Sequence, residues 1–111
     1  MNVKRITDEF AVCGQIMPSD FAALRQAGFR SIIANRPDGE ERGQPSFAET
    51  QAAVEAAGLE IRHVPVRSPG PADAASFGRA FEELPKPVLA FCRSGARSSM
   101  LWTLWQAGRE A

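Results

Sequence analysis

The chain has 111 residues, the length of a single domain, with thirteen lysines and arginines balanced by thirteen aspartates and glutamates. This neutral charge argues against a nucleic-acid-binding protein, because such proteins carry a basic excess on one face. No apolar run approaches the roughly 18 residues that a membrane-spanning helix needs. Two cysteines are too few for a secreted disulfide framework. We therefore expect one cytoplasmic domain over residues 1–111, free-standing or one half of a fusion, without nucleic-acid or membrane partners.

Glycine and proline divide the chain into segments whose apolar patterns alternate between strand and helix. Residues 3–12 are expected to form one or two short strands, and Pro18 opens a helix that Gly28 ends. Ser46 and Glu49 form a capping box that starts the next helix. The helix that this box starts is expected to end at about residue 57. Three further strands are expected at residues 29–34, 59–66 and 87–91. Two further helices are expected at residues 72–84 and from residue 96 or 97 to about 108.

The alternation of strands and helices with short connections predicts the fold. It indicates an α/β fold with a short, mostly parallel central sheet and helices on both faces. In such sheets, ligands bind beyond the carboxyl ends of the strands. The loops at residues 35–45, 65–71 and 92–97 follow predicted strands in this way. We therefore expect the functional site to lie among these three loops.

The sequence Cys-Arg-Ser-Gly-Ala-Arg-Ser at residues 92–98 follows a buried strand directly and opens a helix. Main-chain N–H groups in such a loop, followed by a helix N-terminus, favour the Cys92 thiolate over the thiol. Gly95 permits the tight backbone turn, and Arg97 presents a planar fork to an anion. We predict that Cys92 and Arg97 are catalytic and that the other loop residues bind the substrate anion: Arg93, Ser94, Gly95, Ala96 and Ser98. The two serine hydroxyls are expected either to face the sulfur or its bound group, or to cap the helix.

Three strings carry a resemblance to a known family: FAVCGQ at residues 10–15, IANRPDGE at 33–40 and VLAFCRSGARSS at 88–99. The chain resembles the phosphatase-like domain family of bacterial β-lactamase-hydrolase-like proteins, which occurs free-standing or fused to a metallo-β-lactamase-type domain. The resemblance implies a fold similar to the dual-specificity protein tyrosine phosphatases, with Cys92 in the thiolate position and Arg97 in the anion-binding position. It also implies a metallo-β-lactamase-type sulfur dioxygenase domain as a partner.

The loop departs from the pattern of such phosphatases in its spacing. Four residues separate Cys92 from Arg97, where phosphatases of that fold usually have five. A Cys-x4-Arg loop resembles that of rhodanese-type sulfurtransferases, and a shorter loop fits one sulfur better than a phosphoryl group. Arg67 occupies the position expected for a phosphatase general acid, and Phe91 replaces the histidine that often precedes the cysteine. Sulfane-sulfur transfer needs no strong acid, because its leaving group departs without protonation.

We therefore expect a rhodanese-like sulfurtransferase, in which Cys92 takes sulfur from an anionic donor as a persulfide and passes it to an acceptor thiol. The alternative is a phosphatase of the protein tyrosine phosphatase type, in which Cys92 forms a cysteinyl-phosphate that water hydrolyses. Asp38 or Glu40 would then substitute for the missing acid. A second alternative is a non-catalytic module that binds an oxyanion or a persulfide. In each case the ligand is a small anion that contains sulfur or phosphorus.

Other residues of chemical interest allow a functional and a structural interpretation. Arg36 and Asp38 are either a second anion contact and an acid, or a pair that fixes a turn. Cys13 is interpreted as a small buried residue rather than a resolving thiol, and His63 as a packed histidine rather than a base. One histidine and two distant cysteines cannot form a zinc site, so we expect neither a metal nor a cofactor.

Overall fold

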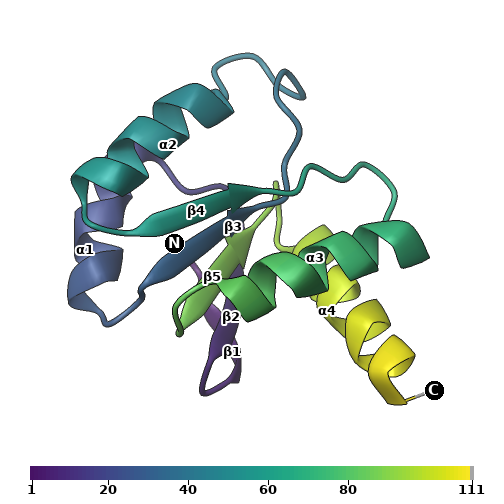
Figure 1. Cartoon of the computed structure of the whole chain (residues 1–111). Helices are drawn as coiled ribbons and strands as arrows, with labels where there is room; N and C mark the ends of the chain where they lie inside the picture. Colours follow the sequence, from purple (N-terminus) through teal and green to yellow (C-terminus); the bar gives the residue numbers. More distant parts are fainter. Residues whose placement is uncertain (111) are drawn as a thin grey trace.

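A computed structural model gives the fold of the chain and describes residues 1–110 (Figure 1). Strands and helices alternate along the chain, as the sequence predicts, and a short 3₁₀ helix precedes the first α-helix. The strands are β1 (Lys4–Thr7), β2 (Phe10–Cys13), β3 (Ser31–Ala34), β4 (Glu60–His63) and β5 (Val88–Phe91). The helices are η1 (Pro18–Asp20), α1 (Phe21–Gln26), α2 (Phe47–Ala56), α3 (Pro71–Glu83) and α4 (Ala96–Glu110).

Several element boundaries differ from those expected. Residues 3–12 form two antiparallel strands, and the helix that Pro18 opens begins as the 3₁₀ turn η1. The strand expected over residues 59–66 is reduced to β4, which ends before Pro65 because proline has no N–H to continue the ladder. Helix α4 passes through Gly108 instead of ending there, since an isolated glycine only weakens a helix.

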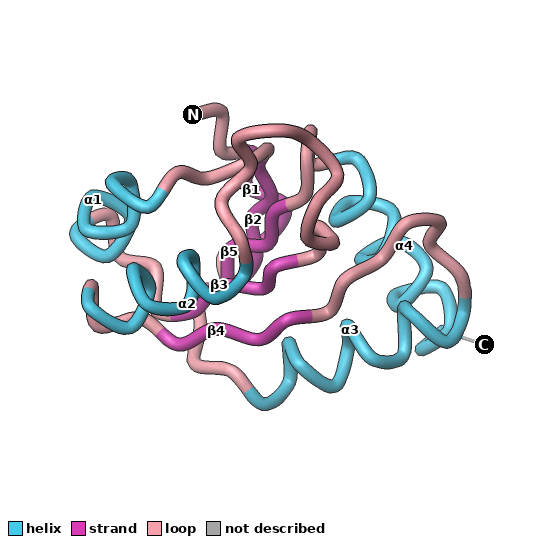
Figure 2. Tube along the Cα trace, turned by 90° about the horizontal axis from the view of Figure 1, so that it is seen from above, coloured by secondary structure: helices cyan, strands magenta, loops and turns pink. Residues whose placement is uncertain are grey.

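The sheet has the order β1-β2-β5-β3-β4, which places β5 at its centre. Strands β2, β5, β3 and β4 are parallel, and β1 runs antiparallel to β2, so the mostly parallel sheet is confirmed. The register pairs Cys13 and Ala34 with Phe91, and Ala34 also with His63. The four parallel strands therefore end level with one another. The loops that follow these strands therefore emerge at the same end of the sheet, formed by the carboxyl ends of the strands; Figure 2 shows the molecule from above.

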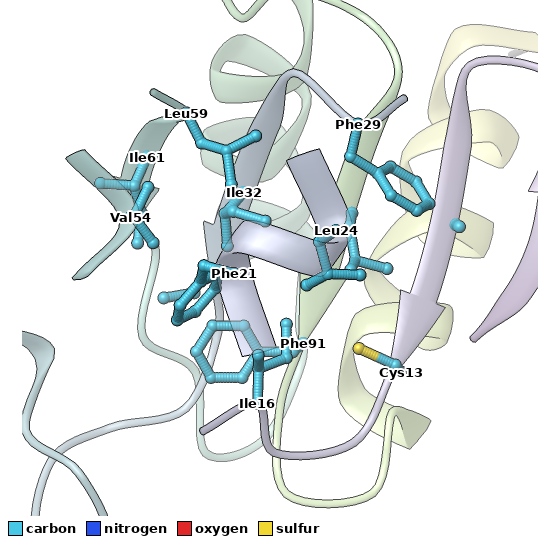
Figure 3. Close-up of a cluster of buried hydrophobic side chains, with 13 residues drawn as sticks. Cys13, Ile16, Phe21, Leu24, Phe29, Ile32, Val54, Leu59, Ile61 and Phe91 are labelled. Atoms are coloured by element: carbon cyan, nitrogen blue, oxygen red, sulfur yellow. The ribbon is translucent and has the colours of Figure 1, made fainter. Parts of the chain in front are cut away.

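Helices cover both faces of the sheet, with α1 and α2 on one face and α3 and α4 on the other (Figures 1 and 2). Two hydrophobic cores result, and successive residues of β5 point alternately into them. The first core, drawn in Figure 3, includes Phe21, Leu24, Ile32, Val54, Leu89 and Phe91. The second includes Phe10, Ile33, Phe77, Phe81, Val88, Ala90 and Leu101. Burial on both faces explains why the central strands have continuous apolar sequences.

Helices α2 and α3 begin where side chains accept hydrogen bonds from main-chain amides. Ser46 Oγ accepts from the Glu49 N–H and Glu49 Oε1 accepts from the Ser46 N–H, both at 3.1 Å, so the predicted capping box of α2 is confirmed. At the start of α3, Asp73 Oδ2 accepts from the Gly70 N–H at 3.1 Å. Within residues 1–110, no helix combines the length and the apolar character that crossing a bilayer needs.

Candidate active site

Cys92 is the first residue after the central strand β5, and a short loop leads from it into α4. The residue is completely buried, and the Gly95 N–H donates a hydrogen bond to its Sγ at 3.0 Å. Because β5 lies between β2 and β3, the loops that follow those two strands emerge beside it (Figure 2). The structure thus places the predicted nucleophile at the carboxyl end of the central strand, where sheets of this kind bind ligands.

The surroundings of Cys92 favour its ionised form. Burial by itself raises the pKa of the Cys92 thiol, but this effect is outweighed by the main-chain N–H groups of Ser98, Ser94, Arg97 and Gly95. The resulting pKa is below the ordinary value of 9.0. A concave ring of N–H groups that leads into a helix N-terminus stabilises negative charge in this way. The thiolate is the form of cysteine that attacks an electrophile.

The end of β2 supports this loop through main-chain contacts. The Gln15 N–H donates to the Arg93 carbonyl oxygen at 3.2 Å, and a Cβ at Gly14 would lie 2.9 Å from that oxygen. Gly95 has a φ of +95°, and a Cβ there would lie 3.2 Å from the Cys13 carbonyl oxygen. Both positions therefore need glycine. Sequence reasoning pointed to Gly95 and missed Gly14, although Gly14 directly follows a predicted strand.

Arg97 lies in the first turn of α4 and is held by a carboxylate from the loop after β3. Its Nη1 and Nη2 donate to Glu40 Oε2 and Oε1, both at 2.8 Å, and Nη1 also donates to the Val66 carbonyl oxygen at 2.8 Å. Arg97 and then Arg36 lower the pKa of Glu40 to about 2, despite an opposing effect of burial. The Glu40 side chain is therefore ionised at neutral pH, which argues against its use as a general acid.

The bonds of Arg97 to Glu40 and Val66 leave one edge of its guanidinium group open toward Cys92. A guanidinium has five N–H donors, and the contacts with Glu40 and Val66 use both hydrogens of Nη1 and one of Nη2. The remaining donors are Nε–H and one Nη2–H, which form the side edge that binds an oxyanion through two parallel bonds. Glu40 first and then Cys92 raise the pKa of Arg97, so the guanidinium lies close to the sulfur. Glu40 therefore fixes Arg97 without occupying the edge that an anion needs.

Arg36 is almost fully buried and is bound by other protein groups. Its Nε donates to Glu40 Oε1 at 3.0 Å, its Nη1 to Gln15 Oε1 at 3.0 Å and its Nη2 to Glu41 Oε1 at 3.2 Å. Each of its three guanidinium nitrogens is thus engaged by the protein. Asp38, considered from the sequence as the turn partner of Arg36 or as an acid, instead accepts from the Phe47 N–H at 2.8 Å and caps α2.

The serine hydroxyls of the loop stabilise its main chain. Ser98 Oγ donates to Asn35 Oδ1 at 2.9 Å, and Asn35 Nδ2 donates to the Val64 carbonyl oxygen at 2.9 Å. Ser98 and Asn35 are fully buried, so this pair ties the start of α4 to the end of β3. Ser94 Oγ accepts from the Ala96 N–H at 3.3 Å. These contacts match the capping alternative for Ser94, and the main-chain N–H of Ser98 contributes to lowering the pKa of Cys92.

Two exposed arginines flank the loop. Arg67 directly follows Val66, whose carbonyl oxygen contacts Arg97, and its side chain is exposed. Arg93 follows Cys92, and 67% of its side-chain surface is accessible; its Nη2 lies 3.5 Å from Glu41 Oε2, which is itself about half exposed. Such a surface ion pair is weak, so the Arg93 guanidinium is free to turn toward a ligand.

The remaining candidates lie in the hydrophobic layers. Burial, and then the negative charge of Cys92, raise the pKa of Cys13 to about 12, which keeps this thiol protonated. His63 stacks on the Phe47 ring with centroids 4.1 Å apart, and its Nε2 is buried without a hydrogen-bond partner. Within residues 1–110, no three His, Cys, Asp or Glu side chains gather closely enough to hold a metal ion.

Comparison with known families identifies a match along nearly the whole chain. The family described as "Beta-lactamase hydrolase-like protein, phosphatase-like domain" matches residues 2–109. A beta-lactamase hydrolase-like protein of Agrobacterium fabrum is 39% identical over 109 residues, which cover 96% of this chain. The corresponding protein of Xylella fastidiosa is 41% identical over 106 residues, which cover 94% of this chain. In both cases the chain spans about a quarter of the relative's length.

Solved structures show the same fold. A candidate phosphatase from Neisseria meningitidis is 32% identical, with a TM-score of 0.91 over all of this chain and 80% of that one. Tk-PTP in its active form is 22% identical, with a TM-score of 0.77 over 98% of this chain and 75% of that one. TpbA of P. aeruginosa, in complex with phosphotyrosine, is 15% identical, with a TM-score of 0.70 over 98% of this chain and 64% of that one. The last two show the fold alone, which is that of protein tyrosine phosphatases.

Proposed function

Since this chain belongs to the phosphatase-like domain family of beta-lactamase hydrolase-like proteins, we propose that it is a phosphatase that acts through a cysteinyl-phosphate on Cys92. The observation that carries the proposal is the position of Cys92 inside a ring of main-chain N–H groups that lowers its pKa, beside the edge of Arg97 that the bonds to Glu40 and Val66 leave open. Together these groups form a bowl for a tetrahedral oxyanion whose floor is the nucleophile.

This proposal favours phosphate hydrolysis over sulfur transfer, the two reactions of Cys92 that the sequence suggests. The family and its structural neighbours carry phosphatase names, and sulfur transfer through a Cys92 persulfide finds no support among them. The preference for sulfur transfer rests on the four-residue spacing between Cys92 and Arg97, on Arg67 at the position expected for the acid, and on Phe91 before the cysteine. That spacing is compatible with a guanidinium near the sulfur, because Cys92 is among the groups that raise the pKa of Arg97.

The reaction has two steps. The Cys92 thiolate attacks phosphorus, an Sγ–P bond forms, and the P–O bond to the leaving group breaks with its electron pair on oxygen. Water then attacks the cysteinyl-phosphate, the S–P bond breaks, and the thiolate returns to the loop amides. Arg97 binds two of the phosphoryl oxygens through Nε–H and Nη2–H, and the loop N–H groups bind the third, as charge spreads over these oxygens.

Substrate binding requires the loop to open. Cys92 has no exposed surface, and the Gly95 N–H that now contacts the sulfur has to turn toward a phosphoryl oxygen. Gly95 has no Cβ, which gives the loop the backbone freedom for this change. The amide hydrogen bonds are thus exchanged between the sulfur and the substrate instead of being lost.

The test is an assay of purified protein with an aryl phosphate, beside Cys92→Ser and Arg97→Lys. We expect phosphate release that Cys92→Ser abolishes and Arg97→Lys strongly reduces, because lysine cannot form the bidentate contact. Rapid quenching should trap a phosphoryl adduct on Cys92. A parallel assay with thiosulfate and cyanide measures thiocyanate. Cys92-dependent thiocyanate without phosphate would restore the sulfurtransferase interpretation, and activity with neither would favour the anion-binding module.

The larger relatives also bear on partners. Because the chain spans about a quarter of the curated relatives, the activity of a whole relative is not carried over to it. A metallo-β-lactamase-type sulfur dioxygenase domain, implied by the resemblance, is proposed as its partner. Co-purification of the two as one chain or one complex, followed by intact mass, would test that arrangement.

A further inference from the structure

We propose that the substrate is a phosphoanhydride, whose leaving group is a second phosphate that departs as an anion without a proton from the protein. The inference rests on the proposed phosphatase activity and names its substrate class. It follows from how the acidic and basic side chains around the loop are used. Cleavage of an alkyl phosphate needs a general acid, because an alkoxide is too basic to leave unprotonated.

Four carboxylates near the site are engaged at the starts of helices. They lie on the loops that follow the parallel strands, or in the first turns of the helices to which those loops lead. Each accepts a main-chain N–H: Asp20 from Met17 at 3.2 Å, Asp38 from Phe47 at 2.8 Å, Glu49 from Ser46 at 3.1 Å and Asp73 from Gly70 at 3.1 Å. Each of these bonds holds the carboxylate against the start of a helix.

The two remaining carboxylates of this edge, Glu40 and Glu41, pair with arginines. Glu40 accepts from Arg97 and Arg36, and Glu41 Oε1 accepts from Arg36 while its Oε2 lies 3.5 Å from Arg93. Within the described residues, each carboxylate at the carboxyl edge of the sheet therefore has a structural partner. None of these six carboxylates is therefore available to donate a proton to the leaving group.

An arginine stands at the position where a phosphatase general acid is expected. This residue, Arg67, lies in the loop after β4 and directly follows Val66, whose carbonyl oxygen accepts a hydrogen bond from Arg97. A second arginine, Arg93, lies within the loop that begins at Cys92. Both side chains are exposed. A guanidinium cannot donate a proton at neutral pH, but it attracts a second phosphate and stabilises the charge that develops on it. The site thus replaces acid catalysis with charge stabilisation of the leaving group.

The step balances without acid catalysis. Sγ bonds to the terminal phosphorus, the bond from that phosphorus to the bridging oxygen breaks, and the electron pair stays on that oxygen. The released phosphate is stable as an anion, because a phosphate group is about half ionised to its dianion near pH 6. Water then attacks phosphorus and the S–P bond breaks with its electron pair on sulfur; one proton of the water stays on the newly formed phosphate and the other goes to solvent. No oxidant, reductant or co-reactant besides water is needed.

A series of leaving groups tests the inference. The probes are inorganic pyrophosphate, adenosine diphosphate, aryl phosphates of graded phenol acidity and an alkyl phosphate. Without acid catalysis, kcat/KM should fall about tenfold for each unit by which the pKa of the leaving group's conjugate acid rises. The alkyl phosphate should therefore be hydrolysed poorly. Turnover of alkyl phosphate and diphosphates at similar rates would overturn this inference alone. Cys92-dependent release from none of the probes would overturn the proposed function together with it.

Arginine variants test the second part. Arg67→Gln and Arg93→Gln should each lower kcat/KM for the diphosphates by about threefold to fivefold, and should change it less for an aryl phosphate with an uncharged leaving group. The matched control is Arg30→Gln, which removes the same charge from an exposed position before β3, at the opposite end of the sheet. It should leave both substrates unaffected. Equal losses for diphosphates and aryl phosphates in the two test variants would exclude a contact with the leaving phosphate.

Discussion

Glu40 and Arg97 are 57 residues apart in the chain, yet their side chains meet through two parallel hydrogen bonds of 2.8 Å. The pair connects the loop after β3 with the first turn of α4. Arg36 donates to the same carboxylate from its buried position, so the orientation of Arg97 depends on a second arginine. The anion-binding edge of Arg97 is therefore positioned before a ligand arrives.

Removal of the Glu40 charge should reduce activity more than stability. In Glu40→Gln, Arg97 loses its bidentate partner and its side chain gains freedom, so kcat/KM for an aryl phosphate should fall about 10- to 100-fold. Binding of inorganic phosphate, measured by calorimetry, should weaken in parallel. Glu41→Gln is the control, because Glu41 is about half exposed and contacts Arg36 but not Arg97. Equal effects of the two substitutions would show that the ion pair does not orient Arg97.

The same pair should produce a defined pH dependence of stability. The pKa of Glu40 falls from 4.5 to about 2 in the folded protein, so its contribution is complete above pH 4.5 and is lost as the pH falls through about 2. The difference in unfolding free energy between wild type and Glu40→Gln should therefore be constant near neutrality and shrink between pH 4.5 and 2. Urea denaturation over this range measures it. A difference that persists unchanged at the acid end would contradict the lowered pKa.

The two cysteines should titrate far apart. The pKa of Cys92 lies below 9.0, whereas that of Cys13 is about 12. As the pH is raised toward 9, the ultraviolet absorbance of thiolate should appear in Cys13→Ser earlier than an ordinary cysteine ionises, and should not appear in Cys92→Ser. As the pH rises from about 9 to 12, ionisation of Cys13 should then destabilise the fold, because its folded pKa is raised. Appearance of the absorbance in Cys92→Ser below this range would place the thiolate elsewhere.

The fold could be predicted from the sequence because local signals agreed with one another. Pro18, the capping box of Ser46 and Glu49, and the apolar run of residues 88–91 each act over a few residues, and the structure has an element at each. The boundaries failed where tertiary contacts decide them. The Val64 N–H still donates to the carbonyl oxygen of Ala34 in β3, but Pro65 has no N–H, and the Val66 N–H donates to Asn35 beyond the end of β3.

The candidate site was only partly predictable for a physical reason. The loop of residues 92–98 is contiguous, so its residue types by themselves indicate an anion site. The partners of Arg97 come from other segments, and a pairing such as Glu40 with Arg97 has no periodicity that would reveal it. Glu40 was considered from the sequence as a substitute acid, and its pairing with two arginines explains why that role does not suit it. Asn35 and Gln15 were missed for the same reason.

The buried Asn35–Ser98 pair should be important for stability. In Asn35→Ala, the Val64 carbonyl oxygen and the Ser98 hydroxyl both lose their partner, so the unfolding free energy should fall by about 2 to 4 kcal/mol. Ser98→Ala breaks one of the two hydrogen bonds and should cost about 1 to 2 kcal/mol. Ser99→Ala, one residue along α4 at a half-buried position, should stay within about 0.5 kcal/mol. Urea denaturation of the three variants gives the ranking, and similar values for all three would contradict the role of the pair.

Gly78 and Gly108 provide a direct comparison of packing with helix propensity. Both are helical, Gly78 in α3 and Gly108 in α4, and alanine normally stabilises a helix by about 1 kcal/mol relative to glycine. A Cβ at Gly78, however, would fall within the Trp105 indole ring, whereas a Cβ at Gly108 would contact nothing within 4 Å. We expect Gly78→Ala to destabilise the protein by about 1 to 3 kcal/mol and to shift the tryptophan fluorescence to longer wavelength, because Trp105 has to leave the groove between α3 and α4.

Gly108→Ala should instead stabilise the protein by about 0.5 to 1 kcal/mol, without a change in fluorescence. Thermal denaturation of both variants, followed by fluorescence and by circular dichroism, distinguishes the two effects. If Gly78→Ala proved as stabilising as Gly108→Ala, Trp105 could not be packed against α3 at that position. The stacking of Trp102 on Phe10, with centroids 4.2 Å apart, and the edge contact between Trp102 and Trp105 would then also have to be revised.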